Sequence, residues 1–517
     1  MRLGIDFGTT RVVVAKADRG QYPVVTFHPN AGQPTRPDSK TPALNRPGLE
    51  WYPSLCAIRG TELRTGPAAV ELLRDPDWQI CRSIKRLLAT CGPQDRVHGW
   101  SVTELLTRFL CDLKTALLTQ SDLDLAPGEP LEVAISVPAN ANANQRMMTV
   151  DAFRKAGFDV CRMLDEPSAA GLEYAWRRPA DARVRKRHVA VYDLGGGTFD
   201  ASIISMGDTR HEVITTDGIA ALGGDDFDAV LLDLCLQQAG LPASTPGPDR
   251  DRWLEICRIE KERFTTSTRT LKPALFGNRR DVGIKVAEYE TALRPLITQT
   301  LDCLQQALDR AHAINGLDIE KSTVVYQVGG ASQLPTVGRM LKEKFARRVW
   351  KSPDAHASVA VGLAIACETD TVERLQNRFT RYFGVWRESD SGRTAWFDPV
   401  FPKDTILPFS QPDQTLRVIR RYRAAHNVGH YRFVECSRLR DDGTPGGDIT
   451  PWCEVRFPMV GELQDQPLDR VDVIRFPEPR EEVEEQYRCD AHGVIEVDLV
   501  NLTRGYRQTY RLHGRAA

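Results

Sequence analysis

Two short segments of the chain repeat the same order of apolar, acidic, glycine and threonine positions. In residues 3–15 (LGIDFGTTRVVVA), an apolar run ends at Asp6, and glycine and threonine then lead into a second apolar run. In residues 188–205 (HVAVYDLGGGTFDASIIS), Asp193 ends a run rich in β-branched and aromatic residues, and three glycines precede Thr198. Such runs predict buried strands joined as hairpins, and the repeat predicts two related lobes.

Glycine turns of this kind are suited to binding phosphate. Glycines have no Cβ and allow backbone N–H groups to converge on an anion. Asp193 and Asp200, at the two ends of the second turn, would repel phosphate unless a divalent cation lay between them, which predicts Mg²⁺ with a nucleotide. An ordinary glycine-rich hairpin is the alternative for this segment alone. Neither turn contains GxxxxGK[ST] or opens a helix, which disfavours a P-loop and a dinucleotide-binding Rossmann unit.

Beyond the hairpins, apolar residues at helical spacing alternate with short apolar runs as far as about residue 370. This alternation predicts a fold of the α/β class. The predicted helices span 67–73, 78–89, 102–118, 144–157, 167–176, 229–238, 252–264, 293–311, 336–345 and 356–367. The predicted strands outside the hairpins span 54–58, 131–137, 160–164, 213–216 and 322–328.

The pattern changes near residue 368. From residue 383 onward, apolar runs alternate with turn signals and show no helical periodicity, which predicts a β-sandwich of about 120 residues. The predicted strands span 431–436, 453–457, 471–476, 484–488, 493–499 and 506–512. We therefore expect an α/β domain over residues 1–368, a polar linker over 369–382 and an all-β domain over 383–517.

Composition and charge narrow the possible functions. Hydrophobic residues make up 41% and charged residues 26%, as in ordinary globular proteins. The formal net charge of −1 creates no global field for nucleic acid or an anionic membrane. Twelve cysteines without paired spacing disfavour a zinc site and a disulfide framework. Because there is neither a run of 18 apolar residues nor a leader-like N-terminus, we expect a cytoplasmic protein that does not bind membranes.

Six motifs, in this order, resemble those of the heat-shock protein 70 (Hsp70) family, the DnaK-type chaperones, which belong to the actin-like ATPase superfamily. They are 5–10 (IDFGTT), 137–139 with 145–146, 165–170 (DEPSAA), 193–200 (DLGGGTFD), 222–227 (LGGDDF) and 328–335 (VGGASQLP). The resemblance extends over nearly the whole chain. It implies a two-lobed, actin-like nucleotide-binding domain, followed by a peptide-binding β-sandwich.

The resemblance also implies ATP or ADP with Mg²⁺ between the lobes. Asp6 and Asp193 would hold the hydrated Mg²⁺ with Glu166 close behind, so that all three count as metal-site residues. Asp193, Thr198 and Glu166 would be the catalytic residues. Taken alone, Glu166 is an acid at a helix N-terminus, where a cap or dipole partner is the alternative. The other nucleotide contacts would come from Gly8, Thr9, Thr10, Gly195, Gly196, Gly197, Gly223, Gly224, Lys261, Gly329 and Gly330.

Three positions depart from the family pattern. An alignment without gaps places Val70 where the family has its phosphate-contacting catalytic lysine. Arg258 and Gln333 replace a glutamate and an arginine of the family's adenosine pocket, which puts adenine as the base in question. At Val70, the loss of a donor to the charge that develops on the phosphate would slow hydrolysis by about 10²–10³-fold unless another cation substitutes. Three nearby cations are candidates for that substitution: Arg74, Lys85 and Arg86.

The second domain resembles the family's peptide-binding sandwich in residues 397–408 and 487–512. The sequence ends at Ala517 without a helical lid, so the resemblance implies a lidless, divergent member. We expect a chaperone-like protein that acts in protein folding and couples slow ATP hydrolysis to the binding of unfolded or extended peptides. Co-chaperones would be further partners. The alternatives are a nucleotide-gated adaptor with little or no hydrolysis and an actin-like small-molecule kinase.

Overall fold

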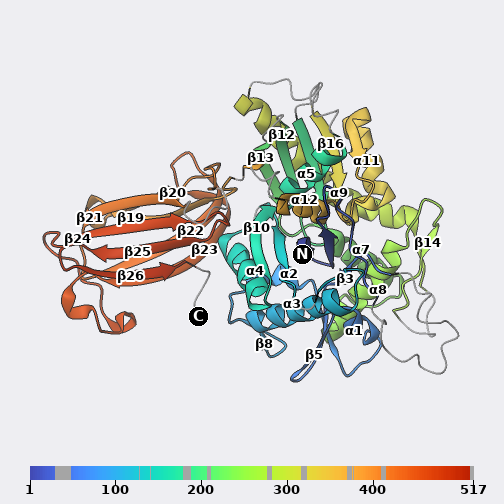
Figure 1. Cartoon of the computed structure of the whole chain (residues 1–517), viewed down its shortest axis with the longest axis horizontal. Coiled ribbons are helices and arrows are strands. Elements are labelled where there is room, and N and C mark those ends of the chain that lie inside the picture. The colour runs from blue at the N-terminus through green and yellow to red at the C-terminus, as the bar shows by residue number, and fades with distance from the viewer. Residues whose placement is uncertain are drawn as a thin grey trace. The chain divides into compact units, whose positions relative to one another are not determined.

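The structure, a computed structural model, describes the chain except residues 29–47, 127, 140, 179–187, 207–210, 276–281, 316–322, 369–374, 377, 409–414 and 513–517. It divides into two compact units, which we describe separately (Figure 1). The first comprises Met1–Thr90, Asp95–Ala139 and Asp151–Leu375. The second comprises Cys91–Gln94, Asn140–Val150 and Gln376–Ala517. Residues 369–374 of the predicted linker and the C-terminal residues 513–517 lie outside the described residues.

The first lobe of the first unit is built on a five-stranded sheet with the order β10-β9-β1-β2-β3. The predicted hairpin forms from β1 (Arg2–Phe7) and β2 (Arg11–Lys16), which pair antiparallel. Parallel strands β9 (Glu132–Val137) and β10 (Asp159–Asp165) extend the sheet. The other elements are β3 (Tyr52–Pro53), β4 (Leu55–Arg59), β5 (Glu62–Thr65), α1 (Gly66–Glu71), β6 (Gln79–Arg82), α2 (Ile84–Thr90), β7 (Arg96–Val97), β8 (Trp100–Ser101) and α3 (Val102–Thr119).

The second lobe repeats this plan with strands β17-β16-β11-β12-β13, and β18 follows β13 as the sixth strand of the sheet. The second predicted hairpin forms from β11 (His188–Leu194) and β12 (Phe199–Met206), and β16 (Thr323–Val328) pairs parallel to β11. The other elements are β13 (His211–Ile219), α7 (Gly224–Gln238), α8 (Arg250–Glu262), β14 (Thr270–Leu271), β15 (Ile284–Lys285), α9 (Val286–Asn315), α11 (Pro335–Phe345), β17 (Val349–Lys351) and β18 (Leu375–Gln376). Helix α4 (Ala143–Lys155) lies at a division between the units along the chain.

Two buried helices, α5 (Glu166–Arg177) and α12 (Ser358–Cys367), pack against each other in the middle of the first unit (Figure 1). Helix α12 covers β1 and β9 of the first sheet, while α5 covers β11 and β12 of the second. Glycine permits this close approach, since a Cβ on Gly362 would lie 1.8 Å from the carbonyl oxygen of Ala169. The N-terminus of α5 is thereby fixed between the sheets, with Glu166 as its first residue.

The predicted helix over 78–89 is wrong in its first half. Residues 79–82 instead form strand β6, which pairs with β4. Ser83 then takes a positive φ of 56°, and helix α2 starts at Ile84. The burial of Ile80 against β4 outweighs the helical spacing of the apolar residues. This break between strand and helix sets the directions of Arg82 and Lys85.

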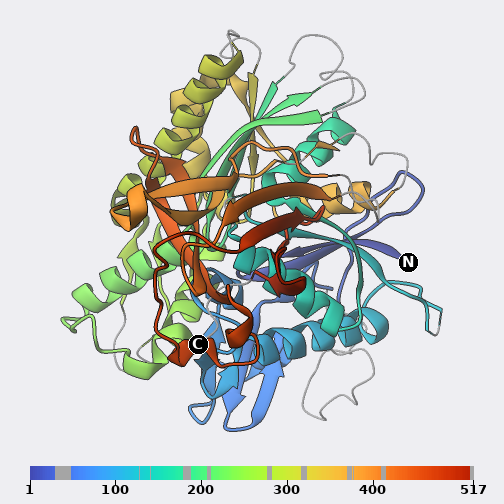
Figure 2. The ribbon, with the colours of Figure 1, turned by 90° about the vertical axis from the view of Figure 1, so that its left-hand side faces the viewer.

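The second unit contains two four-stranded antiparallel sheets, in agreement with the predicted all-β domain (Figures 1 and 2). One sheet has the order β20-β19-β22-β23 and the other β21-β24-β25-β26, and apolar residues of both form a common core. No α-helix occurs among the described residues after Gln376. The strands are β19 (Tyr382–Ser389), β20 (Thr394–Phe401), β21 (Leu416–Arg423), β22 (Val428–Leu439), β23 (Pro445–Pro458), β24 (Glu482–Cys489), β25 (Ile495–Asn501) and β26 (Tyr506–Arg511).

The predicted strand over 471–476 is wrong. This segment is irregular and makes only an isolated bridge, between Arg475 and His426. Val473 and Ile474 are 47% and 59% exposed, so the apolar alternation there does not mark a buried face.

Among the described residues, none of the helices combines the length and apolar character needed to cross a membrane.

Candidate nucleotide-binding cleft

A cleft of about 270 Å³ lies between the two lobes of the first unit. Both predicted hairpins line it, together with the N-terminus of α5 and the glycine pair after β16. The predicted site residues along its wall are Asp6, Gly8, Thr9, Thr10, Glu166, Asp193, Gly195, Gly196, Thr198, Gly224, Lys261, Gly329 and Gly330. Gly197 and Gly223 lie next to this wall: a Cβ on Gly197 would lie 2.6 Å from Thr9 Oγ1, and one on Gly223 would lie 2.7 Å from Gly196.

The two glycine turns face each other so closely that side chains would fill the space between them. A Cβ on Gly196 would lie 2.8 Å from Thr10 Oγ1 of the opposite hairpin. Gly329 has a φ of 87°, and a Cβ there would lie 2.5 Å from Asp193 Oδ1. Helix α7 supports the second turn, because the backbone N–H groups of Gly224 and Asp225 donate to the carbonyl oxygens of Gly195 (3.0 Å) and Gly196 (2.7 Å). Backbone atoms therefore line this part of the cleft, as a phosphate-binding turn requires.

Partly buried Asp6 and buried Asp193 line the cleft, and buried Asp200 lies beside them. Asp6 accepts a hydrogen bond from Ser136 Oγ at 2.8 Å, and Asp200 Oδ1 accepts one from the backbone N–H of Ala139 at 3.1 Å. Burial, with a contribution from the nearby Glu166 carboxylate, raises the pKa of Asp6 to about 6 and that of Asp200 to about 7. The same causes, with repulsion from the two other aspartates, raise the pKa of Asp193 well above its ordinary value.

This donor set fits a divalent cation bound with phosphate. Asp200 Oδ2 is buried and has no hydrogen-bond partner in the described structure, and the carboxylates destabilise one another in their charged forms. A positive ion among them would relieve that repulsion. The described residues contain no group of three or more acidic, histidine or cysteine side chains that could hold a metal by themselves. The ion would therefore be held through water and nucleotide oxygens, as Mg²⁺ commonly is.

Lys85 supplies a cation where the sequence alignment leaves Val70. Val70 is half-buried in an apolar cluster and does not line the cleft, whereas Lys85 lines it from α2. Lys85 Nζ forms an ion pair with Glu166, and only 7% of the Lys85 side chain is exposed. Burial opposes the charge, but attraction to Glu166 and Asp6 outweighs it and raises the pKa of Lys85, so the ammonium group stays protonated.

The two other cations that the sequence offered lie elsewhere. Arg86 donates to the carbonyl oxygen of Gly197 at 2.7 Å and to Asp226 at 2.9 Å, so it braces the glycine turn. Arg74 is exposed and does not line the cleft. Sequence reasoning missed this distinction because the apolar pattern does not mark the break at Ser83, after which α2 begins at Ile84.

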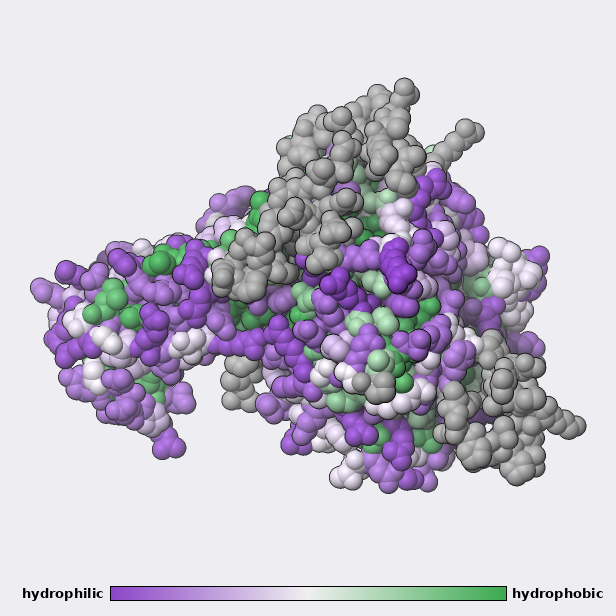
Figure 3. Space-filling view, viewed as in Figure 1, coloured by the Kyte–Doolittle hydropathy of each residue, from purple (hydrophilic) through white to green (hydrophobic). Residues whose placement is uncertain are grey.

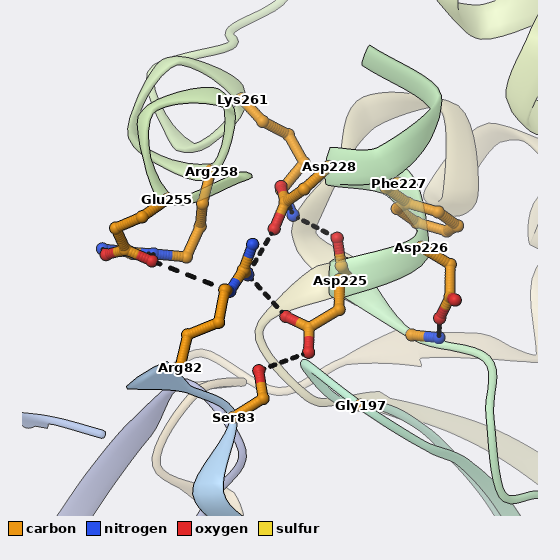
Figure 4. Close-up of polar contacts among 12 residues, drawn as sticks. Arg82, Ser83, Gly197, Asp225, Asp226, Phe227, Asp228, Glu255, Arg258 and Lys261 are labelled. Atoms are coloured by element: carbon orange, nitrogen blue, oxygen red, sulfur yellow. Dashed lines mark hydrogen bonds and ion pairs between the residues drawn. The ribbon is translucent and has the colours of Figure 1, made fainter. Parts of the chain in front are cut away.

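A buried ionic cluster joins the two lobes beside the phosphate turns (Figure 4). From β6 of the first lobe, Arg82 Nη2 donates to Asp225 at 2.6 Å and Asp228 at 2.8 Å, both on α7 of the second lobe. Ser83 Oγ adds a 2.5 Å hydrogen bond to Asp225. Lys261 on α8 pairs with Asp228 at 2.6 Å and donates to the carbonyl oxygen of Gly224 at 2.6 Å. Lys261 therefore lines the cleft while it also belongs to the cluster.

Further charged pairs lie along the cleft. Arg258 pairs with Glu255 and, at 2.7 Å, with Glu262. Arg11 Nη2 also pairs with Glu262, at 2.5 Å, and its guanidinium lies 3.9 Å from the centre of the Trp51 ring. Gln333 also lines the cleft. Arg258 is thus neutralised by two carboxylates, and the identity of the base stays a prediction.

Comparison with known proteins agrees with this geometry. Residues 110–377, just over half of the chain, match the family described as Hsp70 protein. Among curated proteins, the chain is 31% identical over 387 residues to a protein named as a chaperone protein HscA homolog from Laribacter hongkongensis. A protein of the same name from Acidithiobacillus ferrooxidans is 30% identical over 378 residues, and one from Azotobacter vinelandii is 35% identical over 243 residues.

These matches extend over only part of the relatives. The Laribacter and Acidithiobacillus matches take in 71% of this chain and 58% of each relative, and the Azotobacter match takes in 47% and 37%. The match to the family over half the chain, together with the mixed α/β lobes and the antiparallel sandwich, confirms the predicted resemblance and fold class. The chain belongs to the Hsp70 family and is a distant homologue of the HscA chaperones.

Proposed function

We propose that the chain binds Mg-ATP in the cleft, hydrolyses it slowly and couples the nucleotide state to peptide binding by the sandwich. The observation that carries this proposal is the Lys85–Glu166 ion pair at the floor of a cleft formed by two opposed glycine turns. A buried ammonium beside three aspartates has no packing role that an apolar side chain would not fill better. It is, however, well placed to contact a phosphate.

Each side chain of the cleft then has a separate task. Mg²⁺ would neutralise phosphate charge, with Asp6 and Asp193 holding its water ligands. Lys85 would donate to the terminal phosphate and stabilise the charge that develops there, and Glu166 would keep Lys85 charged and directed into the cleft. Thr9, Thr10, Thr198 and the backbone of the glycine turns would bind the other phosphate oxygens. Asp193 and Thr198 would orient the attacking water.

Extended peptide is the ligand we propose for the sandwich, with co-chaperones as further partners. Support comes from the family and from the arrangement of strands, because β21 and β26 end one sheet and provide edges for strand addition. The outward-facing residues of β21 are mostly arginines around Ile419, which is 52% exposed. The face seen in Figure 3 is mostly hydrophilic over the sandwich, with small apolar groups. We therefore propose clients that combine a few apolar side chains with acidic ones.

Calorimetry of ATP and ADP binding beside single-turnover hydrolysis tests the proposal. We expect both nucleotides to bind when Mg²⁺ is present, and slow turnover that Asp193→Asn abolishes. Binding without turnover above buffer would remove the enzymatic part. Absence of binding would overturn the site.

A nucleotide-gated adaptor without hydrolysis is the second candidate. It is favoured by Val70, which leaves the family's lysine position apolar. The two candidates differ in the single-turnover result alone, because both require nucleotide to bind.

A further inference from the structure

Two thiols are in contact within the first unit, far from each other in sequence. Cys161 lies on β10, and Cys367 is the last residue of α12, 206 positions later. Their Sγ atoms are 3.7 Å apart. A backbone carbonyl oxygen lies near each sulfur, that of Val133 at 3.3 Å from Cys161 and that of Leu3 at 3.1 Å from Cys367, and competes with the other thiol for the single S–H proton. A sheet and a packed helix thus hold both sulfurs in place, and a disulfide would need them to approach to about 2.05 Å.

An irregularity in β10 accounts for the position of Cys161. The register with β9 shifts between Val160 and Arg162, which leaves Cys161 as the extra residue of a bulge. A bulge bends its strand and redirects the side chain of the unpaired residue. Here the redirected thiol contacts the end of α12.

The two thiols differ in reactivity. Cys161 is half-buried and Cys367 is buried. When the single S–H proton of Cys367 points to Cys161, this hydrogen bond and the positive charge of Arg162 lower the pKa of Cys161, against burial and the negative charge of Glu132. The same hydrogen bond and burial raise the pKa of Cys367. Cys161 therefore has the properties of an attacking thiolate and Cys367 those of a resolving thiol.

We propose that Cys161 and Cys367 are an oxidisable pair that forms a reversible disulfide when the protein meets a peroxide. The Cys161 thiolate attacks one peroxide oxygen, the O–O bond breaks, and a sulfenic acid and one water result after proton transfer. The Cys367 sulfur then attacks the sulfenic sulfur and displaces the second water. In sum, two thiols lose two electrons and two protons, and one hydrogen peroxide becomes two waters.

The disulfide would connect parts of the fold that matter for the cleft. Strand β10 ends at Asp165, directly before Glu166, and α12 packs on α5, which begins at Glu166. Oxidation would fix the end of α12 against β10 and close a loop of about 200 residues. Loops of that size give large stabilisation, so we expect the unfolding midpoint of the first unit to rise by roughly 5–10 °C.

A second cysteine pair provides an internal control. Cys56 and Cys81 lie opposite each other in the register of β4 and β6, and both are buried. Burial raises the pKa of Cys81 to about 12 and that of Cys56 well above its ordinary value. These thiols are close in the fold but lack the thiolate character that the proposal requires, so they should stay reduced.

The experiment treats the full chain with hydrogen peroxide, alkylates the remaining thiols and maps the tryptic peptides by mass spectrometry. We expect peptides 156–162 and 352–374 to be joined, with a mass two hydrogen atoms below their sum, and to separate after treatment with dithiothreitol. The thermal midpoint should rise with the joined peptide. Cys56 and Cys81 should be alkylated as in the untreated protein.

Two conservative variants test the order of the steps. In Cys367→Ser, a sulfenic acid at Cys161 should accumulate and react with dimedone, whereas Cys161→Ser should leave Cys367 a free thiol. The proposal is overturned if the untreated and peroxide-treated proteins give the same alkylation at both positions. It is also overturned if Cys161 is oxidised to sulfinic acid while Cys367 stays a thiol.

Discussion

The cleft and the sandwich both contain carboxylates shielded from solvent, but the groups around these carboxylates differ. In the cleft, Asp6, Asp193 and Asp200 lie near one another with raised pKa values, and one oxygen of Asp200 has no partner in the described structure. In the sandwich, Asp398 accepts hydrogen bonds from Arg387 at 2.7 Å and from Arg420 at 3.0 Å. Among the described residues of the sandwich, each deeply buried carboxylate has an arginine within ion-pair distance.

Hydrogen bonding explains the contrast. Arg387 also binds Glu485 with two bonds of 2.9 and 2.8 Å, and Tyr487 donates to the same carboxylate at 2.5 Å. Burial alone would raise the pKa of Asp398, yet the two arginines lower it. A buried carboxylate that accepts hydrogen bonds from neighbouring arginines stabilises the fold. A buried carboxylate that faces other carboxylates is a candidate for binding a ligand. We therefore place the chemistry in the cleft and a structural role in the ionic core of the sandwich.

The largest effect is expected from Arg387→Met in the sandwich. This change leaves the fully buried Glu485 without its two-pronged partner, and breaking a buried pair costs about 3–5 kcal/mol. Urea unfolding followed by the sandwich's tryptophan fluorescence measures this loss, and Arg417→Met on exposed β21 is the matched control. Nucleotide binding should stay at the wild-type level. An Arg387→Met protein as stable as the control would refute the structural role.

A smaller effect, on affinity, should follow from Gly329→Ala. The new Cβ would lie 2.5 Å from Asp193 Oδ1, and the backbone has a left-handed φ of 87°. The left-handed backbone costs a residue with Cβ about 1–2 kcal/mol of stability with or without nucleotide, whereas displacement of Asp193 by the new Cβ should lower ATP affinity by about tenfold. Gly240→Ala is the control, since Gly240 also has a left-handed φ, of 67°, lies outside the cleft and has nothing within 4 Å of its added Cβ. Equal affinities in calorimetry would show that the cleft does not depend on this approach to Asp193.

Next, Arg82→Met should speed nucleotide release. Arg82 is the side chain of the first lobe that holds Asp225 and Asp228 of the second, so its loss should make opening of the lobes easier. We expect the dissociation rate of a fluorescent ADP to rise by about tenfold, which corresponds to 1.4 kcal/mol. Arg59→Met removes an exposed arginine of the same small sheet and should leave the rate unchanged. A rate for Arg82→Met equal to that control would exclude a latch between the lobes.

The smallest effect concerns pH. Because the pKa of Asp398 is lower in the folded protein than its ordinary 3.8, its ionic contribution is fully present above that value and disappears as the pH falls through the folded pKa. The stability difference between wild type and Asp398→Asn should therefore be largest near neutral pH and shrink below about pH 4. Urea unfolding at pH 7 and at pH 3 measures this difference. A difference that grows on acidification would contradict the assignment.

Sequence patterns predicted the parts of the molecule where local and global preferences agree. Apolar periodicity predicted the two hairpins, the long helices α3 and α9, and the change from α/β to all-β structure. The order of the motifs predicted a shared site, and in the structure the glycine turns line one cleft with Asp6, Asp193 and Glu166. The β21 strand was missed because its charged residues hide the alternation.

Other features depended on tertiary packing. The positive φ of Ser83 interrupts a helical pattern between Arg82, which contacts the second lobe, and Lys85, which lines the cleft. No spacing rule predicts such a break, because the hydrogen bond from Ser83 to Asp225 that accompanies it comes from a residue 142 positions away. The Cys161–Cys367 contact is equally long-range and depends on a bulge.

We propose that Lys85 performs the task for which the sequence alignment offered only Val70. Single-turnover hydrolysis of Mg-ATP by Lys85→Met, compared with wild type and with Arg74→Met, tests it most directly. We predict a loss of about 10²–10³-fold for Lys85→Met, as expected for one lost donor to the developing charge, and no loss for Arg74→Met. A Lys85→Met protein that turns over as fast as wild type would contradict the account.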